Sequence, residues 1–230
     1  MKHSKIKSPD QIFSLFTKYR KSTVYKFRGQ SDSSWQLTPK AGRATLKNQD
    51  DFLLFKHWKR RAIAYIQKEN LNDWELLAVA NHYGLPTRLL DWSQNPLIAL
   101  FFACVENFDV DGAVYVCQIK KFLDISKLGP FEIEKDLIHF IQPTASSLRL
   151  MNQLGYFSIH EDPSTALTDD SGFGTIEKIT IPKDIKKEIV FILNHFGINN
   201  LMIYPDLDGL SKHLIWFYEN YEYWDGNFPK

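Results

Sequence analysis

Apolar and polar residues recur along this chain with two periods, one typical of strands and one typical of helices. Residues 176–181 fall into two alternating sets, as in a half-buried strand, and residues 112–119 form the apolar run of a core strand. Apolar residues recur near helical spacing over 48–67. The pattern predicts strands over 23–28, 112–119, 153–160 and 176–181, and helices over 48–67, 74–83, 97–105, 184–196 and 210–221, with an earlier helix capped by Ser8 or Asp10.

Local signals predict where several of these elements begin and end. We expect Asn72 or Asp73 to cap helix 74–83 and Asp208 to cap the last helix, because short polar side chains accept hydrogen bonds from exposed N–H groups there. Residues 124–142 are too weakly patterned to assign, 146–151 predicts a helical turn or two, 162–174 predicts a loop, and 201–204 is a short apolar run. We find no repeat and no linker, and therefore expect one α+β domain over 1–230, with a mixed or antiparallel central sheet and flanking helices.

The stretch 82–103 stands out because polar residues interrupt elements that should be buried. Gly84 and Pro86 predict a helix stop, and Leu89 and Leu90 form a short strand-like run. A helix that is apolar on nearly all sides follows and should lie in the core. We expect Ser93 to act as its N-cap.

Buried polar groups require partners or a ligand, so this stretch is a candidate site. Its polar members are His82, Thr87, Arg88, Asp91, Ser93 and Asn95. The alternative is a structural junction stapled by an Arg88–Asp91 ion pair. His82 and Tyr83 are likewise either a base with a stacking ring or a favourable helix cap.

Composition excludes several classes of function and leaves others open. The net charge is +1, so no strong overall field favours nucleic acid or an anionic membrane. The one strong basic cluster, 56–61, is either a solvated helix face or a nucleic-acid surface. Aromatic residues make up 14% of the chain, which is enough both to fill a core and to line a site for a planar ligand.

The two cysteines predict a reducing compartment, and we expect a cytoplasmic protein. Cys104 and Cys117 fall in predicted core elements, where they should be buried free thiols. No ligand spacing for a metal is present, and neither a secretory signal nor an apolar run of membrane-spanning length is visible. The segment 206–209 resembles a calcium loop but lacks the remaining ligands, so it is expected to be a helix cap. We expect no metal and no membrane partner.

Four separated blocks of sequence resemble the FRG domain family, which takes its name from a Phe-Arg-Gly motif. The blocks occur in the order typical of that family and extend over about residues 23–215. They are Phe27-Arg28-Gly29-Gln30, the stretch from His82 to Ala103, Arg149 to Phe157, and Tyr204 to Leu210. The family consists mainly of bacterial and phage proteins.

The layout is also similar to that of ADP-ribosyltransferases of the Arg-Ser-Glu type, which implies an NAD-binding fold of that kind. The resemblance implies that Arg28 grips the NAD phosphates and that Ser93 holds the nicotinamide ribose. Gln153 stands where those transferases carry a Glu, and Glu161 is the fallback carboxylate. A neutral amide stabilises an oxocarbenium-like transition state less well than a carboxylate. Arg28 is otherwise a structural residue bridged to Asp32 or Asp91.

The resemblance thus implies an enzyme that transfers ADP-ribose from NAD to a protein or nucleic acid, or that hydrolyses NAD. Such an activity would suit a toxin or an anti-phage effector. A non-catalytic module that binds a ligand or partner is the second reading, and a nucleic-acid-binding protein is the third. The residues expected to contact NAD are Arg28, Gly29, Gln30, His82, Tyr83, Thr87, Arg88, Asp91 and Phe157.

Overall fold

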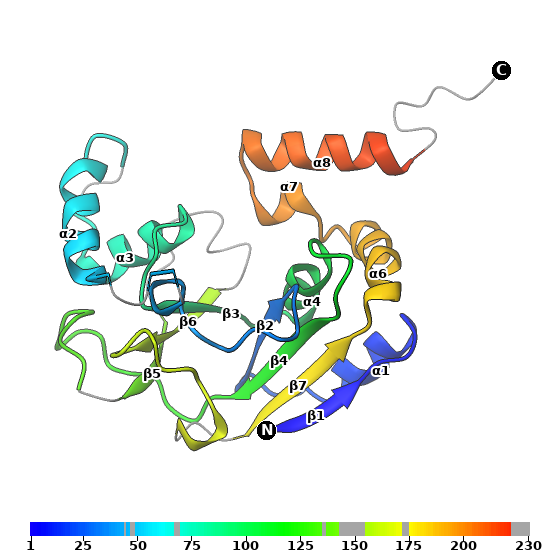
Figure 1. The fold of residues 1–230 in the computed structure, drawn as a ribbon, viewed down its shortest axis with the longest axis horizontal. Coiled ribbons are helices and arrows are strands. Elements are labelled where there is room, and N and C mark those ends of the chain that lie inside the picture. Colours follow the sequence, from blue (N-terminus) through cyan, green and yellow to red (C-terminus); the bar gives the residue numbers. More distant parts are fainter. Residues whose placement is uncertain are drawn as a thin grey trace.

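A computed structural model describes residues 1–43, 45–46, 49–66, 70–134, 137–142, 155–171 and 175–221 of the chain. Its centre is a seven-stranded mixed sheet with the order β1-β7-β4-β2-β3-β6-β5 (Figure 1). The strands are β1 (Lys2–Lys5), β2 (Tyr25–Gln30), β3 (Leu89–Ser93), β4 (Gly112–Gln118), β5 (Ile138–Ile141), β6 (Gly155–His160) and β7 (Ile176–Ile181). The expected α+β domain with a mixed sheet and flanking helices is confirmed.

The pairing within the sheet is uneven. β1 runs parallel to β7, and the other neighbours are antiparallel. β2 pairs with β4 over six positions, from Tyr25–Gln118 to Gln30–Ala113. Within the described residues, β2 and β3 pair only at Phe27–Ser93. The sheet is therefore loosely joined between β2 and β3, where the Arg28 side chain lies.

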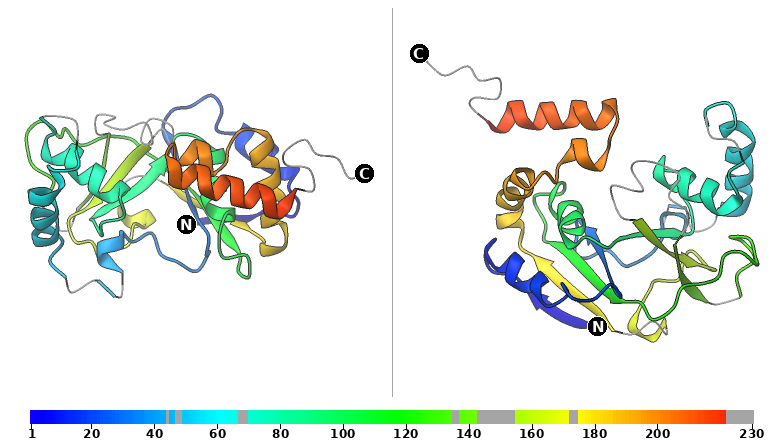
Figure 2. Two further views of the ribbon diagram at one scale, coloured as in Figure 1. Left: turned by 90° about the horizontal axis from the view of Figure 1, so that it is seen from above. Right: turned by 180° about the vertical axis from the view of Figure 1, so that it is seen from behind.

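Helices cover one face of the sheet in two groups (Figures 1 and 2). On β2, β4 and β7, a core containing Phe27, Val114 and Ile179 packs against α1, α4 and α6. On β3 and β6, a second core containing Leu89 and Phe157 packs against α2 and α3. The helices are α1 (Gln11–Thr17), α2 (Asp51–Ala62), α3 (Asp73–His82), α4 (Pro96–Cys104), α6 (Lys183–His195), α7 (Asn200–Ile203) and α8 (Leu207–Asn220), with short 3-10 turns at Lys40–Gly42 and Asp169–Ser171.

Loops cover the opposite face. Leu37, from the segment after β2, and Leu167, from the segment after β6, pack with Trp92, Tyr115 and other strand residues into a third core. β4 is buried on both faces, which explains its continuous apolar sequence. Cys104 and Cys117 are both buried and free, as expected, and burial raises the pKa of each thiol to about 12.

Several local predictions are confirmed. Asn72 caps α3 through a reciprocal pair of hydrogen bonds with Glu75. Gly84, with φ of +85°, follows the end of the same helix, and this left-handed conformation favours glycine.

Other local predictions are wrong. Asn95 and not Ser93 is the N-cap of α4, since its side chain accepts a hydrogen bond from Leu97 N at 2.9 Å. Asp206 and not Asp208 caps α8. β1 has no predicted counterpart, β5 falls in the segment left unassigned, and the run at 201–204 is mostly helix α7. The turn expected at 146–151 lies outside the described residues.

Candidate functional site

Strand β2 presents three consecutive residues with separate roles. Phe27 points into the helix-covered core. Gly29 lies on the same face directly under α4, where an added Cβ would be 1.8 Å from the Ala99 carbonyl oxygen. Only a residue without a side chain allows this close approach of helix and strand. Arg28 alternates to the opposite face, and it is the member of the motif that is available for chemistry.

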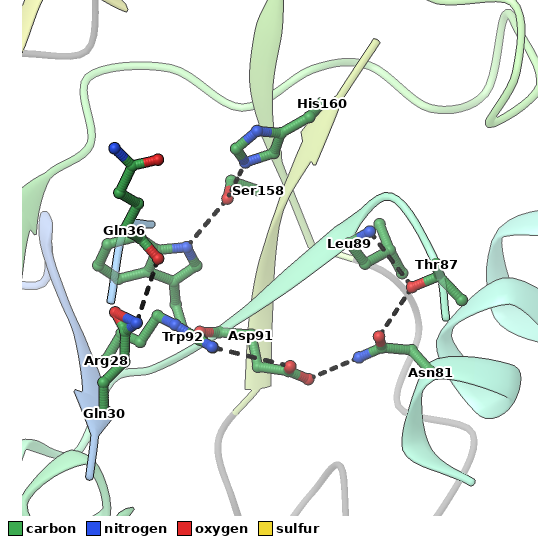
Figure 3. Close-up of polar contacts among 10 residues, drawn as sticks. All are labelled: Arg28, Gln30, Gln36, Asn81, Thr87, Leu89, Asp91, Trp92, Ser158 and His160. Carbon is green, nitrogen blue, oxygen red and sulfur yellow. Dashed lines mark hydrogen bonds and ion pairs between the residues drawn. The ribbon is translucent and has the colours of Figure 1, made fainter. Parts of the chain in front are cut away.

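The Arg28 side chain bridges the loosely joined strands β2 and β3 (Figure 3). Its NH1 donates to the Asp91 carbonyl oxygen at 2.8 Å and lies 3.8 Å from the Asp91 carboxylate. Its buried Nε has no hydrogen-bond partner among the described residues. The side chain is only 13% exposed, and burial lowers the pKa of Arg28 to about 10, so the group remains charged near neutral pH. Of the two alternatives for a bridge, Asp32 and Asp91, the structure selects Asp91.

The Asp91 carboxylate is held by a chain of hydrogen bonds from α3 (Figure 3). Asn81 Nδ2 donates to Asp91 Oδ1 at 2.8 Å, and the Thr87 hydroxyl donates to Asn81 Oδ1 at 2.8 Å. The Thr87 hydroxyl oxygen in turn accepts from Leu89 N. Asp91 stands on a buried strand, yet its side chain is 55% exposed. The arrangement keeps an oriented carboxylate in contact with solvent beside a buried guanidinium.

A second arginine joins this pair. Arg43 lies close enough to Arg28 and Asp91 that its charge lowers the pKa of Arg28, while Asp91 raises the pKa of Arg43. Partial desolvation is the larger effect on Arg43 and lowers its pKa. The guanidinium carbon of Arg43 is 5.9 Å from the centre of the Trp35 ring, which is 43% exposed. Two cations, one carboxylate and an aromatic ring therefore converge here.

Arg43 and Trp35 also line a pocket of about 430 Å³. Its volume falls within the range typical of small-molecule sites. Tyr115 supports the wall by donating its hydroxyl to the Trp35 carbonyl oxygen at 3.1 Å. The lining residues are Trp35, Gln36, Thr38, Gly42, Arg43 and Ser164.

The expected Arg88–Asp91 ion pair is wrong. Arg88 forms a bidentate ion pair with Asp51 at the start of α2. Its Nε donates to Asp51 Oδ2 at 2.8 Å and its NH2 donates to Asp51 Oδ1 at 2.7 Å. Its guanidinium also lies 4.4 Å from the centre of the Phe131 ring. Arg88 lies just before β3, whereas Asp91 lies within that strand beside Arg28 and Asn81, so the two residues have different partners. Arg88 thus attaches α2 to the sheet.

A second buried polar chain runs along β3 and β6 (Figure 3). Trp92 Nε1 donates to Ser158 Oγ at 3.1 Å, and Ser158 Oγ lies 3.2 Å from His160 Nε2. His160 Nδ1 lies 2.8 Å from the Thr165 carbonyl oxygen. Since that carbonyl can only accept, Nδ1 carries the proton and the Ser158 hydroxyl donates to Nε2. Burial lowers the pKa of His160 to about 4, with the charge of Arg28 a further cause.

Two of the residues matched to the Arg-Ser-Glu pattern, Arg28 and Ser93, lie on adjacent strands. β2 carries Arg28, and its neighbour β3 ends at Ser93, whose register partner on β6 is Gly155. Ser93 is buried and shares the sheet face of Phe27, and its Oγ accepts from Asn95 N. Gln153 lies outside the described residues. Glu161 follows the other end of β6, with its backbone N–H bonded to the Leu137 carbonyl.

The remaining expected ligand contacts divide between surface and core. Tyr83 ends α3 with its ring 76% exposed, and it makes an edge contact with the His82 ring. Phe157 is only 2% exposed and belongs to the core under α3. Gln30 is buried and donates to the Gln36 carbonyl, which positions the segment that lines the pocket.

Sequence reasoning missed Arg43, Trp35 and Asn81. Nothing in the polar segment 31–43 marked Arg43 as a neighbour of Arg28. Among the described residues, no group of three or more His, Cys, Asp or Glu side chains is arranged to hold a metal. None of the described helices is long and apolar enough to cross a membrane.

The fold and this site define an α+β domain in which Arg28, Arg43 and Asp91 form a charged cluster where strands β2 and β3 are loosely paired. Residues 23–112 match the FRG domain, so this part of the chain is an FRG domain. The matched segment contains β2, Arg43, α2, α3, β3 and α4, and therefore the complete Arg28–Asp91–Asn81 cluster. Comparison with curated proteins and with solved structures found no match.

Proposed function

We propose that this domain binds NAD at the Arg28–Arg43–Asp91 cluster and cleaves its nicotinamide–ribose bond, passing ADP-ribose to water or to an acceptor. The observation that carries the proposal is the buried, charged Arg28 with a free Nε, beside a second arginine and an oriented carboxylate. The fold is, on this proposal, related to that of ADP-ribosyltransferases.

The two guanidinium groups suit a diphosphate. Arginine presents a planar set of donors that matches phosphate oxygens, and buried charge-assisted hydrogen bonds are the strong ones. Arg28 has an unused donor, and Arg43 lines the adjacent pocket. The exposed ring of Trp35 offers a stacking surface for a planar base.

Asp91 supplies the carboxylate that Gln153 lacks. Cleavage breaks the bond between C1′ of the ribose and the nicotinamide nitrogen, and nicotinamide leaves with the electron pair. Positive charge develops on the ribose, and a fixed carboxylate stabilises it. The oxygen of water or of an acceptor hydroxyl then bonds to C1′ and releases its proton. Asn81 holds one Asp91 oxygen, which leaves the other directed toward Arg28.

The order of the strands supports the same proposal. Arg28 lies on β2, Ser93 lies on the neighbouring strand β3, and β6 is the next strand of the sheet. We expect this order from the resemblance to the Arg-Ser-Glu transferases. Ser93 enters this arrangement as a residue that shapes the turn into α4, since its Oγ accepts from Asn95 N.

The test measures NAD binding by calorimetry and free nicotinamide by NMR for the wild type, Arg43→Gln and Asp91→Asn. Arg43→Gln should weaken NAD binding by about tenfold, since a charged hydrogen bond contributes about 1.5 kcal/mol or more. Asp91→Asn should bind NAD within about threefold of wild type and release nicotinamide about 100-fold more slowly. Arg20→Gln, at an exposed arginine beyond α1, is the matched control and should change neither quantity.

The two readouts separate the possible failures. Binding without release, also in the presence of a cell extract that supplies acceptors, would contradict the enzyme and favour the binding module. Absence of NAD binding by the wild type would overturn the proposal as a whole. Arg28→Ala would not separate these failures, because removing a nearly buried donor to the Asp91 carbonyl oxygen would also destabilise the fold.

A further inference from the structure

The solvent-facing side of α2 is strongly cationic. The side of the helix that contains Asp51, Phe55 and Ala62 is buried. At 3.6 residues per turn, the opposite side forms two rows along the helix axis. These rows are Phe52, Lys56 and Arg60, and Leu53, His57 and Arg61, and four of the six are basic.

No acidic residue of α2 offsets these charges. The only one, Asp51, lies on the buried side and is paired with Arg88. Among the described residues, Asp73 pairs with Lys59, while Lys56 and Arg60 have no ion-pair partner. The positive charge of this face therefore stands out against a chain whose net charge is only +1.

We infer that this face of α2 is a docking surface for single-stranded nucleic acid. Lysines and arginines one turn apart follow a phosphate backbone, and binding to it is favoured by counterion release. Just beyond the helix, the Tyr65 ring is 86% exposed, which suits stacking on an unpaired base. Phosphates would pair with the cations of α2 and unpaired bases would stack on Tyr65, so a single-stranded nucleic acid accounts for both features of this surface.

An anionic membrane suits the same face less well. A helix that lies on a membrane inserts an apolar side into the lipid. The apolar side of α2 is already packed against the protein core, where Phe55 contacts Trp58 and Phe131. The exposed apolar residues lie at the two ends of the helix, at Phe52 and Leu53 and again at Ile63 and Tyr65. They do not form a continuous stripe beside the cations.

The experiment measures fluorescence anisotropy of a labelled single-stranded DNA of about 20 nucleotides over a range of salt concentrations. Binding by the wild type should weaken with salt, and Lys56→Glu/Arg60→Glu should bind at least about tenfold more weakly. The log–log salt slope should fall by about 1.4, because each lost phosphate contact on a single strand removes about 0.7. Lys183→Glu/Lys187→Glu on α6 has the same charge change and spacing at exposed sites and should bind within about twofold of wild type.

The results test nucleic-acid binding by α2 independently of the proposed binding of NAD. A loss confined to the α2 variant supports the inference. No binding by the wild type at about 50 mM salt and about 100 µM protein would overturn it, as would equal losses in both variants. So would binding to anionic vesicles that exceeds binding to DNA. If the Glu variant melts early, Lys56→Gln/Arg60→Gln replaces it, with the slope as the readout.

Discussion

Acid should destabilise this domain by protonating one buried residue, His160. The imidazole is fully buried and neutral, and it accepts from Ser158 while donating to the Thr165 carbonyl. Protonation would add a charge in the core and remove the acceptor that the Ser158 hydroxyl needs. Burial accordingly lowers the pKa of His160 to about 4.

The size of the effect follows from linkage. In the unfolded chain the pKa is about 6.5, so the unfolded state binds more protons than the folded state between about pH 6.5 and pH 4. This contribution to stability is therefore complete above that window and is lost as the pH falls through it. The full loss is about 3 kcal/mol, and about 2 kcal/mol of it occurs between pH 7 and pH 5.

Urea unfolding followed by tryptophan fluorescence at pH 7 and pH 5 measures this contribution. His160→Gln should be less stable than wild type at pH 7, because the packing and hydrogen bonds change, but it should lose about 2 kcal/mol less than wild type between the two pH values. His57→Gln, on the exposed face of α2, is the matched control and should keep the wild-type pH dependence. Equal pH dependence in wild type and His160→Gln would refute the assignment of a buried neutral imidazole.

Three further predictions concern the supports of the site. Gly29→Ala should lower the free energy of unfolding in urea by more than about 3 kcal/mol, because its Cβ would lie 1.8 Å from a backbone oxygen of α4. Gly129→Ala is the control and should be nearly neutral, because its Cβ would meet only a flexible side chain. Similar losses in the two variants would contradict the close packing of α4. Asp51→Asn should cost about 3–5 kcal/mol, because it leaves the Arg88 charge buried without its partner, and a loss below about 1 kcal/mol would show that the pair is dispensable. Lys186→Met should cost about 3 kcal/mol and lower the melting temperature, since the buried Lys186 Nζ donates to carbonyl oxygens at 2.6, 2.7 and 3.0 Å. An unchanged melting temperature would contradict that role.

The FRG motif illustrates how far sequence reasoning reached. The strand that carries Arg28 was inferred correctly as a local feature. The close packing that requires a glycine at position 29 is made with Ala99 of α4, seventy positions along the chain. The polar junction at 82–103 was also found, but the partner of Arg88 was assigned to Asp91, the nearest carboxylate in sequence, instead of Asp51.

The sequence by itself determined the features that short-range physics controls. Alternation and helical spacing predicted most strands and helices, and Asn72 and Gly84 marked the two ends of α3. The apolar sequence of α4 predicted that this helix is buried, and both cysteines were expected in the core, where they lie.

Only the tertiary structure decided which of these elements are neighbours. The sheet order brings β2, β3 and β6 together, joins Arg28 to Asp91 and brings Arg43 to both. Such contacts depend on how whole elements pack and pair, since a side chain chooses its partner by position in space and not by distance along the chain. The candidate site of this FRG domain therefore forms only when the fold brings together residues that are far apart in the sequence.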